Sequence, residues 1–240
     1  MKLTRKLIPA FVMLLVSAVL MSTASFAWFA MNTNVTATGM EVKAKADSIF
    51  LEISGAQDKD GGEDVWKTVG TDMAVDGDGK VTTPVSLYPA DHKTFANADD
   101  IDKKGNWFYK YVNTPDNATA GAGNSQEIGD LTDYVYHTTF KVRLNENMVQ
   151  SAANLRVSSI TLPADTGITA IIRCGDLFKE FEASNAEVAQ GDGLLLAAMG
   201  KDPVVIDVYI YIDGENANVY TNNATKLTGA VSFTLTVNAS

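Results

Sequence analysis

Hydrophobic and polar residues alternate with a period of two through much of the second half of the chain. The clearest segments are residues 134–144, 204–213 and 231–237. In the last of them, one face collects four apolar side chains: Val231, Phe233, Leu235 and Val237. In residues 204–213 the aliphatic side chains share one face, opposite Asp207, Tyr209, Tyr211 and Asp213. Such alternation is typical of half-buried antiparallel strands.

Further strands are expected where short β-branched or aromatic runs occur. These are residues 40–46, 49–54, 107–112, 155–162 and 168–174. Helical signal is scarce: an apolar helix near the N-terminus, a short helix at residues 176–182 and a turn at residues 194–199. Roughly eight strands with so little helix predict an all-β fold, a two-sheet antiparallel jelly-roll-like β-sandwich preceded by an N-terminal apolar signal helix.

The amino-acid composition changes between residues 55 and 133, where Gly, Asp and Asn are as frequent as they are in loops. We interpret this region as a loop-rich part of the same sandwich, which then spans residues 40–240. Residues 28–39 form a separate N-terminal segment.

The first 27 residues have the organisation of a secretory signal peptide. Lys2, Arg5 and Lys6 precede an apolar run, and Ser25 and Ala27 are small residues of the kind that signal peptidase requires. We expect cleavage between Ala27 and Trp28, so that residues 1–27 are removed. The alternative is retention, because residues 7–31 are long enough to cross a bilayer if left uncut.

Charge and cysteine content narrow the class of protein. The formal net charge of −10 becomes −13 when the three cations of the signal peptide are lost. An acidic surface disfavours nucleic acid and anionic membranes, so we expect no nucleic-acid partner and membrane contact only through the signal segment. The single cysteine, Cys174, allows no internal disulfide, as is common in secreted proteins of Gram-positive bacteria.

The sequence favours a protein that is not an enzyme and carries no cofactor. Only His92 and His137 could serve as imidazole bases, and nothing in the sequence orients either toward Cys174. The common hydrolase signatures are missing.

Two acidic motifs are candidates for calcium binding. Asp58 and Asp60, and likewise Asp76 and Asp78, are alternate carboxylates followed by glycine. A turn of this kind lets carboxylates converge on a hard cation. Neither motif completes a full calcium-binding loop, and hairpin turns explain both equally well.

The N-terminal region resembles that of exported proteins with a SipW-type signal peptide, whose best-known members are the TasA/camelysin biofilm-matrix proteins. The resemblance rests on Ala-Ser-Phe-Ala-Trp-Phe-Ala at residues 24–30 and Asn-Val-Thr-Ala-Thr-Gly-Met-Glu-Val-Lys at residues 34–43. It implies a jelly-roll sandwich that is exported by a dedicated signal peptidase of the SipW type and assembled outside the cell. Some members polymerise by lending an N-terminal strand to a neighbour.

The segment after the cleavage site is compatible with that mode of assembly. Residues 28–38 are β-prone and nearly uncharged, and a free strand of this kind can pair with an open sheet edge. The candidate assembly residues are Trp28, Phe29, Met31 and Val35.

The resulting hypothesis is an extracellular structural subunit of a fibre, biofilm matrix or cell-surface layer that self-associates by strand addition. The first alternative is a monomeric cell-surface binding module for a glycan or host ligand. The second is a pilin-like subunit that keeps residues 7–31 as a helix.

Overall fold

The computed structural model describes residues 41–46, 51–55, 58–73, 87–109, 126–145, 151–216, 219 and 230–239. The chain divides into two compact units, Met1–Thr36 and Ala37–Ser240, and all described residues belong to the second unit. The predicted signal helix and the candidate donor segment lie outside the described residues. Among the residues that are described, no helix is long and apolar enough to cross a bilayer.

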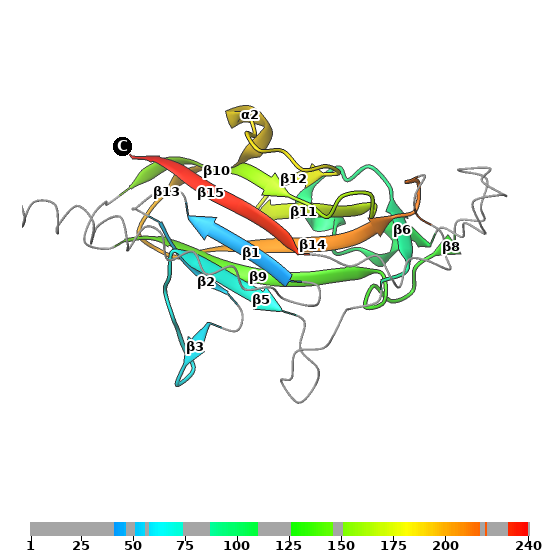
Figure 1. The fold of residues 1–240 in the computed structure, drawn as a ribbon, viewed down its shortest axis with the longest axis horizontal. Coiled ribbons are helices and arrows are strands. Elements are labelled where there is room, and N and C mark those ends of the chain that lie inside the picture. The colour runs from blue at the N-terminus through cyan, green and yellow to red at the C-terminus, as the bar shows by residue number, and fades with distance from the viewer. Residues whose placement is uncertain are drawn as a thin grey trace, which may run out of the picture. The chain divides into compact units, whose positions relative to one another are not determined.

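Two mixed β-sheets face one another in a sandwich-like arrangement (Figure 1). Sheet A has the strand order β13 (Leu194–Met199), β10 (Ala152–Thr161), β15 (Val231–Ala239), β1 (Glu41–Ala46) and β5 (Val69–Met73). Sheet B runs from β12 (Leu177–Phe181) through β11 (Ile168–Cys174), β14 (Val204–Asp213) and β9 (Val135–Leu144) to β2 (Leu51–Gly55). The short strands β6 (Pro89–His92), β7 (Trp107–Tyr109) and β8 (Gln126–Glu127) extend sheet B from the end of β14. The remaining elements are the hairpin β3 (Lys59–Asp60) and β4 (Glu63–Asp64), the 3-10 helices η1 (Ala98–Asp100) and η2 (Lys104–Asn106), and the helix α2 (Gln190–Gly193).

The predicted β-sandwich is confirmed, but the prediction of purely antiparallel sheets is wrong. β1 pairs in parallel with β15, and the end of β14 pairs in parallel with β6. Figure 1 shows the first pair as the blue and red strands lying side by side. Alternation favours antiparallel strands because it reports one buried face, but a parallel pair within a mixed sheet can also have one buried face, so the pattern does not exclude such pairs.

The main core fills the space between the sheets, as the alternation predicts. Phe233 and Leu235 of β15 are buried, whereas Thr234 between them is only partly buried. The ring of Phe233 meets that of Phe140 from sheet B edge to face, with ring centroids 5.8 Å apart. This contact joins the two sheets through their centres.

A second core lies on the other face of sheet B. Residues 87–109 and 126–135, called here the outer layer, bury Ile101, Trp107 and Ile128 against side chains of β11 and β14. Tyr209 and Tyr211 are only 5% and 4% exposed beneath this layer. The alternation correctly places them opposite the aliphatic side chains of β14. The half-buried strand that it predicts is wrong, because a layer from a distant part of the chain covers that face.

Two other predictions on local structure are wrong. Residues 177–181 form the strand β12 and not a helix, since Gly175, at a φ of 57°, allows a tight turn that pairs Leu177 with Cys174. Residues 194–199 form the strand β13 and not a turn. A short apolar run without periodicity does not distinguish these structures.

Candidate functional site at the open edge of sheet A

β13 is the terminal strand of sheet A and differs from the other edge strands in composition. It pairs with β10 on one side, and no strand among the described residues pairs with its other side. Its sequence, Leu-Leu-Leu-Ala-Ala-Met, has no charged residue and no proline. By contrast, β12 carries Lys179 and Glu180, and β5 carries Asp72. Charges and prolines are the usual protection of an edge strand against pairing with another chain, and β13 lacks both.

The side chains of β13 leave its edge accessible. Leu195 and Met199 are buried in the core, which fixes the strand in the sheet. Ala197 and Ala198 are exposed, and their small side chains offer little steric obstruction to an approaching backbone. β13 is therefore held in the sheet by Leu195 and Met199, while Ala197 and Ala198 are open to solvent. β12 of sheet B lies nearby.

An apolar cavity adjoins this edge. It has a volume of about 390 Å³, and its apolar lining includes Leu196 of β13, Cys174 at the end of β11 and Val205 of β14. Arg173 and Asp207 line it as well. Val205 is 46% exposed, and an exposed large apolar side chain beside a cavity is a feature of many interaction sites. β13 and this cavity together are called here the edge site.

The chemistry of Cys174 does not suit catalysis. Burial, with a smaller contribution from the nearby Asp207 carboxylate, raises the pKa of the Cys174 thiol to about 11. A thiol that stays protonated at neutral pH is a poor nucleophile. His92 and His137 direct their Nε2 atoms to Glu180 and Asp207 respectively, so these contacts do not orient either imidazole toward Cys174.

Sequence reasoning missed a polar cluster beneath the outer layer. His92 Nε2 lies 2.9 Å from Glu180 Oε1 and 3.1 Å from the hydroxyl of Tyr211, and that hydroxyl also donates to Glu180 Oε1. The imidazole stacks on Phe95 at 4.2 Å and meets the edge of Trp107 at 5.1 Å. The cluster joins the outer layer to β12 and β14. No local sequence motif predicts this cluster, because His92 is 88 residues from Glu180 and 119 residues from Tyr211 along the chain.

A second polar cluster ties the outer layer to the same face of sheet B. Asp102 accepts hydrogen bonds from the hydroxyl of Tyr209 at 2.7 Å and from the guanidinium of Arg173 at 2.8 Å. Arg173 also donates to Asp99 at 2.9 Å. Burial, together with the Asp102 carboxylate, raises the pKa of Tyr209, so this phenol remains a donor at neutral pH.

The His92 cluster predicts a pH-dependent stability. Burial is the largest single influence on His92 and opposes its protonation. The hydrogen bonds with Glu180 and with the backbone of Lys93, together with the nearby carboxylates of Glu180 and Asp91, exceed it in sum and raise the pKa of His92 above its ordinary 6.5. Burial likewise opposes ionisation of Glu180, yet its hydrogen bonds with His92 and Tyr211 lower the pKa of Glu180 below 4.5. The stabilisation from His92 is therefore complete below pH 6.5 and is lost as pH rises through its folded pKa. That from Glu180 is complete above pH 4.5 and is lost on acidification.

We expect His92→Gln to lower the free energy of unfolding by about 1–2 kcal/mol near pH 6, because a partly buried hydrogen bond between His92 and the Glu180 carboxylate is lost. The difference from the natural chain should shrink as pH rises to about 9. Urea titrations at several pH values measure both quantities. His137→Gln is the matched control, since the His137 side chain is 45% exposed. An equal pH dependence in the two variants would contradict this role of His92.

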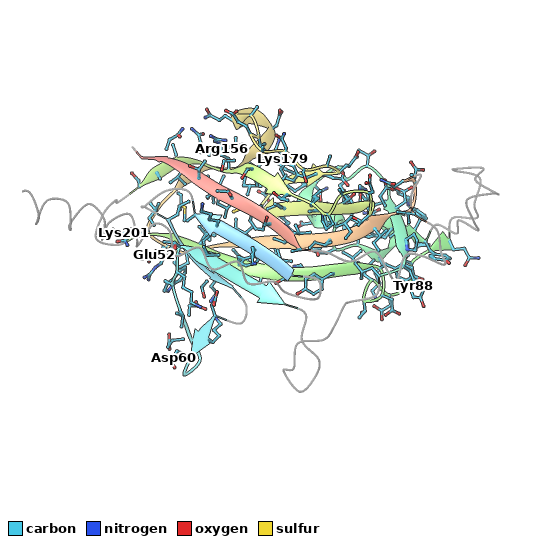
Figure 2. The ribbon with its side chains drawn as sticks, viewed as in Figure 1. Glu52, Asp60, Tyr88, Arg156, Lys179 and Lys201 are labelled. Atoms are coloured by element: carbon cyan, nitrogen blue, oxygen red, sulfur yellow. The ribbon has the colours of Figure 1, made fainter. Side chains whose placement is uncertain are left out.

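Only one of the two candidate calcium motifs lies in the part of the chain that the structure describes. Asp58 accepts a hydrogen bond from the backbone of Gly55 at 2.9 Å and pairs with Lys67. Asp60 lies near the tip of the β3–β4 hairpin, which projects away from the sheets (Figure 2). Asp76 and Asp78 lie outside the described residues. Within the described part of the chain, no three acidic, histidine or cysteine side chains form a group suited to a metal ion.

The remaining predicted residues, Ala27, Trp28, Phe29, Met31 and Val35, also lie outside the described residues.

No family model, no curated protein and no solved structure matches the chain. The edge site was not identified from sequence, because recognising β13 as an edge requires the pairing order of the whole sheet.

Proposed function

We propose that this chain is an exported structural subunit of an extracellular fibre, biofilm matrix or cell-surface layer. In this proposal, residues 28–38 of one copy add as a strand to the edge site of the next copy. The observation that carries the proposal is the uncharged, proline-free edge of β13 beside an apolar cavity. Backbone hydrogen bonds along β13 would supply affinity, and an apolar side chain in the cavity would set the register.

The order of elements is compatible with strand addition. Among the described residues, the first strand of sheet A begins at Glu41, which comes after residues 28–38 in the chain. The segment is short of charged residues, as an apolar edge requires. The proposal includes export through a SipW-type signal peptide, cleavage before Trp28 and a jelly-roll-like fold of the TasA/camelysin kind, all of which rest on the sequence.

Removal of the donor segment tests the proposal. A chain that begins at Gly39 should fold and remain monomeric, whereas the chain that begins at Trp28 should form filaments or large oligomers. Light scattering and negative-stain microscopy measure the difference. Val35→Pro should act like the truncation, because proline removes a backbone donor.

Val35→Thr is the matched control, since threonine keeps both the backbone donor and the β-branched side chain. It should assemble as the natural sequence does. If the chain that begins at Trp28 stays monomeric at high concentration, the binding-module hypothesis replaces the fibre. If native protein retains Met1, the pilin-like hypothesis replaces it.

A further inference from the structure

A polar pocket of about 520 Å³ opens on the outer face of sheet A. Seven polar side chains line it: Lys45, Arg156, Ser158, Ser159, Glu187, Gln190 and Thr234. Residues 186–190 cover one side of it. The pocket shares no lining residue with the cavity of the edge site, so the two features are independent.

A β-bulge in β10 creates the floor of this pocket. The register of β10 against β15 shifts between Val157 and Ser159, while Val157 and Ile160 stay in the core. Two consecutive serines, Ser158 and Ser159, are thereby left half-buried on the outer side. Bulges are over-represented beside functional sites, because they re-aim side chains in this way.

The covering segment is held firmly on the bulge. The backbone N–H of Val188 donates to the carbonyl of Ser158 at 2.8 Å. A Cβ at Gly193 would lie 2.1 Å from the carbonyl oxygen of Val157, so α2 packs directly on β10 and this position requires glycine. The pocket is therefore pre-formed.

Arg156 is positioned by the same segment. Its guanidinium donates to the carbonyl oxygen of Val188 at 3.1 Å. Figure 2 shows Arg156 on the side of the sheet that carries α2. That hydrogen bond uses one of the five N–H donors of an arginine. A half-buried guanidinium held in one orientation is well suited to a bidentate contact with an oxyanion.

The charge around the pocket is unusual for so acidic a chain. The chain has 29 acidic residues against 19 basic ones, yet the strands β10, β13 and β15 contain no Asp or Glu. Lys45 and Arg156 line the pocket together with one carboxylate, Glu187, which gives a local sum of +1. The pocket is thus a cationic site on an anionic protein.

We propose that this pocket binds a sugar residue that carries an oxyanion, either a carboxylate or a phosphate. Arg156 and Lys45 pair with the anionic group, and the hydroxyls of Ser158, Ser159 and Thr234 bond with the sugar hydroxyls. A volume of about 520 Å³ exceeds what a bare ion needs and lies in the range of small-molecule sites. None of the lining residues is aromatic, so recognition is by hydrogen bonds and charge instead of ring stacking.

Calorimetric titration of the full mature chain with glucuronic acid, glucose 6-phosphate, glucose and inorganic phosphate tests the proposal. We expect both acidic sugars to bind at least about tenfold more tightly than glucose or inorganic phosphate. Arg156→Gln and Lys45→Gln should each weaken acidic-sugar binding at least about fivefold. Lys201→Gln removes the same charge elsewhere on the surface, as the labels in Figure 2 show, and should leave binding unchanged.

Three results would overturn the proposal. The first is no saturable binding of either acidic sugar up to about 10 mM. The second is inorganic phosphate binding as tightly as glucose 6-phosphate, which would mean that the sugar is not recognised. The third is an equal loss of binding in Lys201→Gln and Arg156→Gln, which would reflect net charge alone. None of these results depends on whether the protein forms filaments.

Discussion

Replacing Phe233 with alanine is expected to lower the free energy of unfolding by about 3–5 kcal/mol. Phe233 is 2% exposed and packs edge to face on Phe140 of the opposite sheet. The truncation removes buried apolar area and leaves a cavity between two sheets whose backbones are fixed by long ladders, so the space cannot collapse. Denaturant titration monitored by fluorescence measures the loss.

Thr234→Ala is the control at the adjacent position. Thr234 lies on the other face of β15 and is only partly buried, so its truncation should cost less than about 1 kcal/mol. Equal losses in the two variants would mean that Phe233 does not connect the sheets in the way that its contacts indicate.

Ala198→Lys is expected to abolish assembly while leaving the fold intact. Ala198 is exposed on β13, so a lysine there can extend into water without disturbing the core. An incoming strand would have to bury or displace that charge, which is how natural edge strands resist pairing. Sedimentation and microscopy of the mature chain should show monomers, and thermal unfolding should be close to that of the natural chain.

Ala230→Lys is the matched control for this experiment. Ala230 is also exposed and lies just before β15, away from the terminal strand β13 in the pairing order of sheet A. That variant should assemble normally. If Ala198→Lys forms filaments as well as the natural chain does, the edge site is not the acceptor. The outer edge of β12, with which no described strand pairs, would then be the next candidate acceptor.

The sequence pattern predicts the inner faces of the long strands well and the outer faces poorly. Alternation places Phe233 and Leu235 in the core, where they are found. It also places Tyr209 and Tyr211 on the opposite face of β14, where they are found, but it does not predict that residues 87–109 cover that face. A layer built from short strands and 3-10 turns has no periodicity by which its position could be predicted.

Of the proposed donor and acceptor, the sequence suggests only the donor, which lies outside the described residues and stays a prediction. The apolar, uncharged character of residues 28–38 is a local property of the sequence. The proposed acceptor edge cannot be recognised locally, because Leu194–Met199 has the composition of a buried segment. Only the strand order of sheet A shows that, among the described residues, no strand pairs with one side of it. The same holds for the pocket on sheet A, whose bulge at Ser158 and Ser159 depends on the register with β15.

The parallel pairing of β1 with β15 has a consequence for the time at which the protein becomes folded. Val42 of β1 is matched to Val231 of β15, so the first described strand gains this neighbour only after nearly the entire chain is available. Contacts of such long sequence separation slow folding. A polypeptide translocated from its N-terminus would hold β1 unpaired with β15 throughout its passage. If the chain is exported as proposed, sheet A can be completed only after β15 has crossed the membrane, and the chain remains incompletely folded until then.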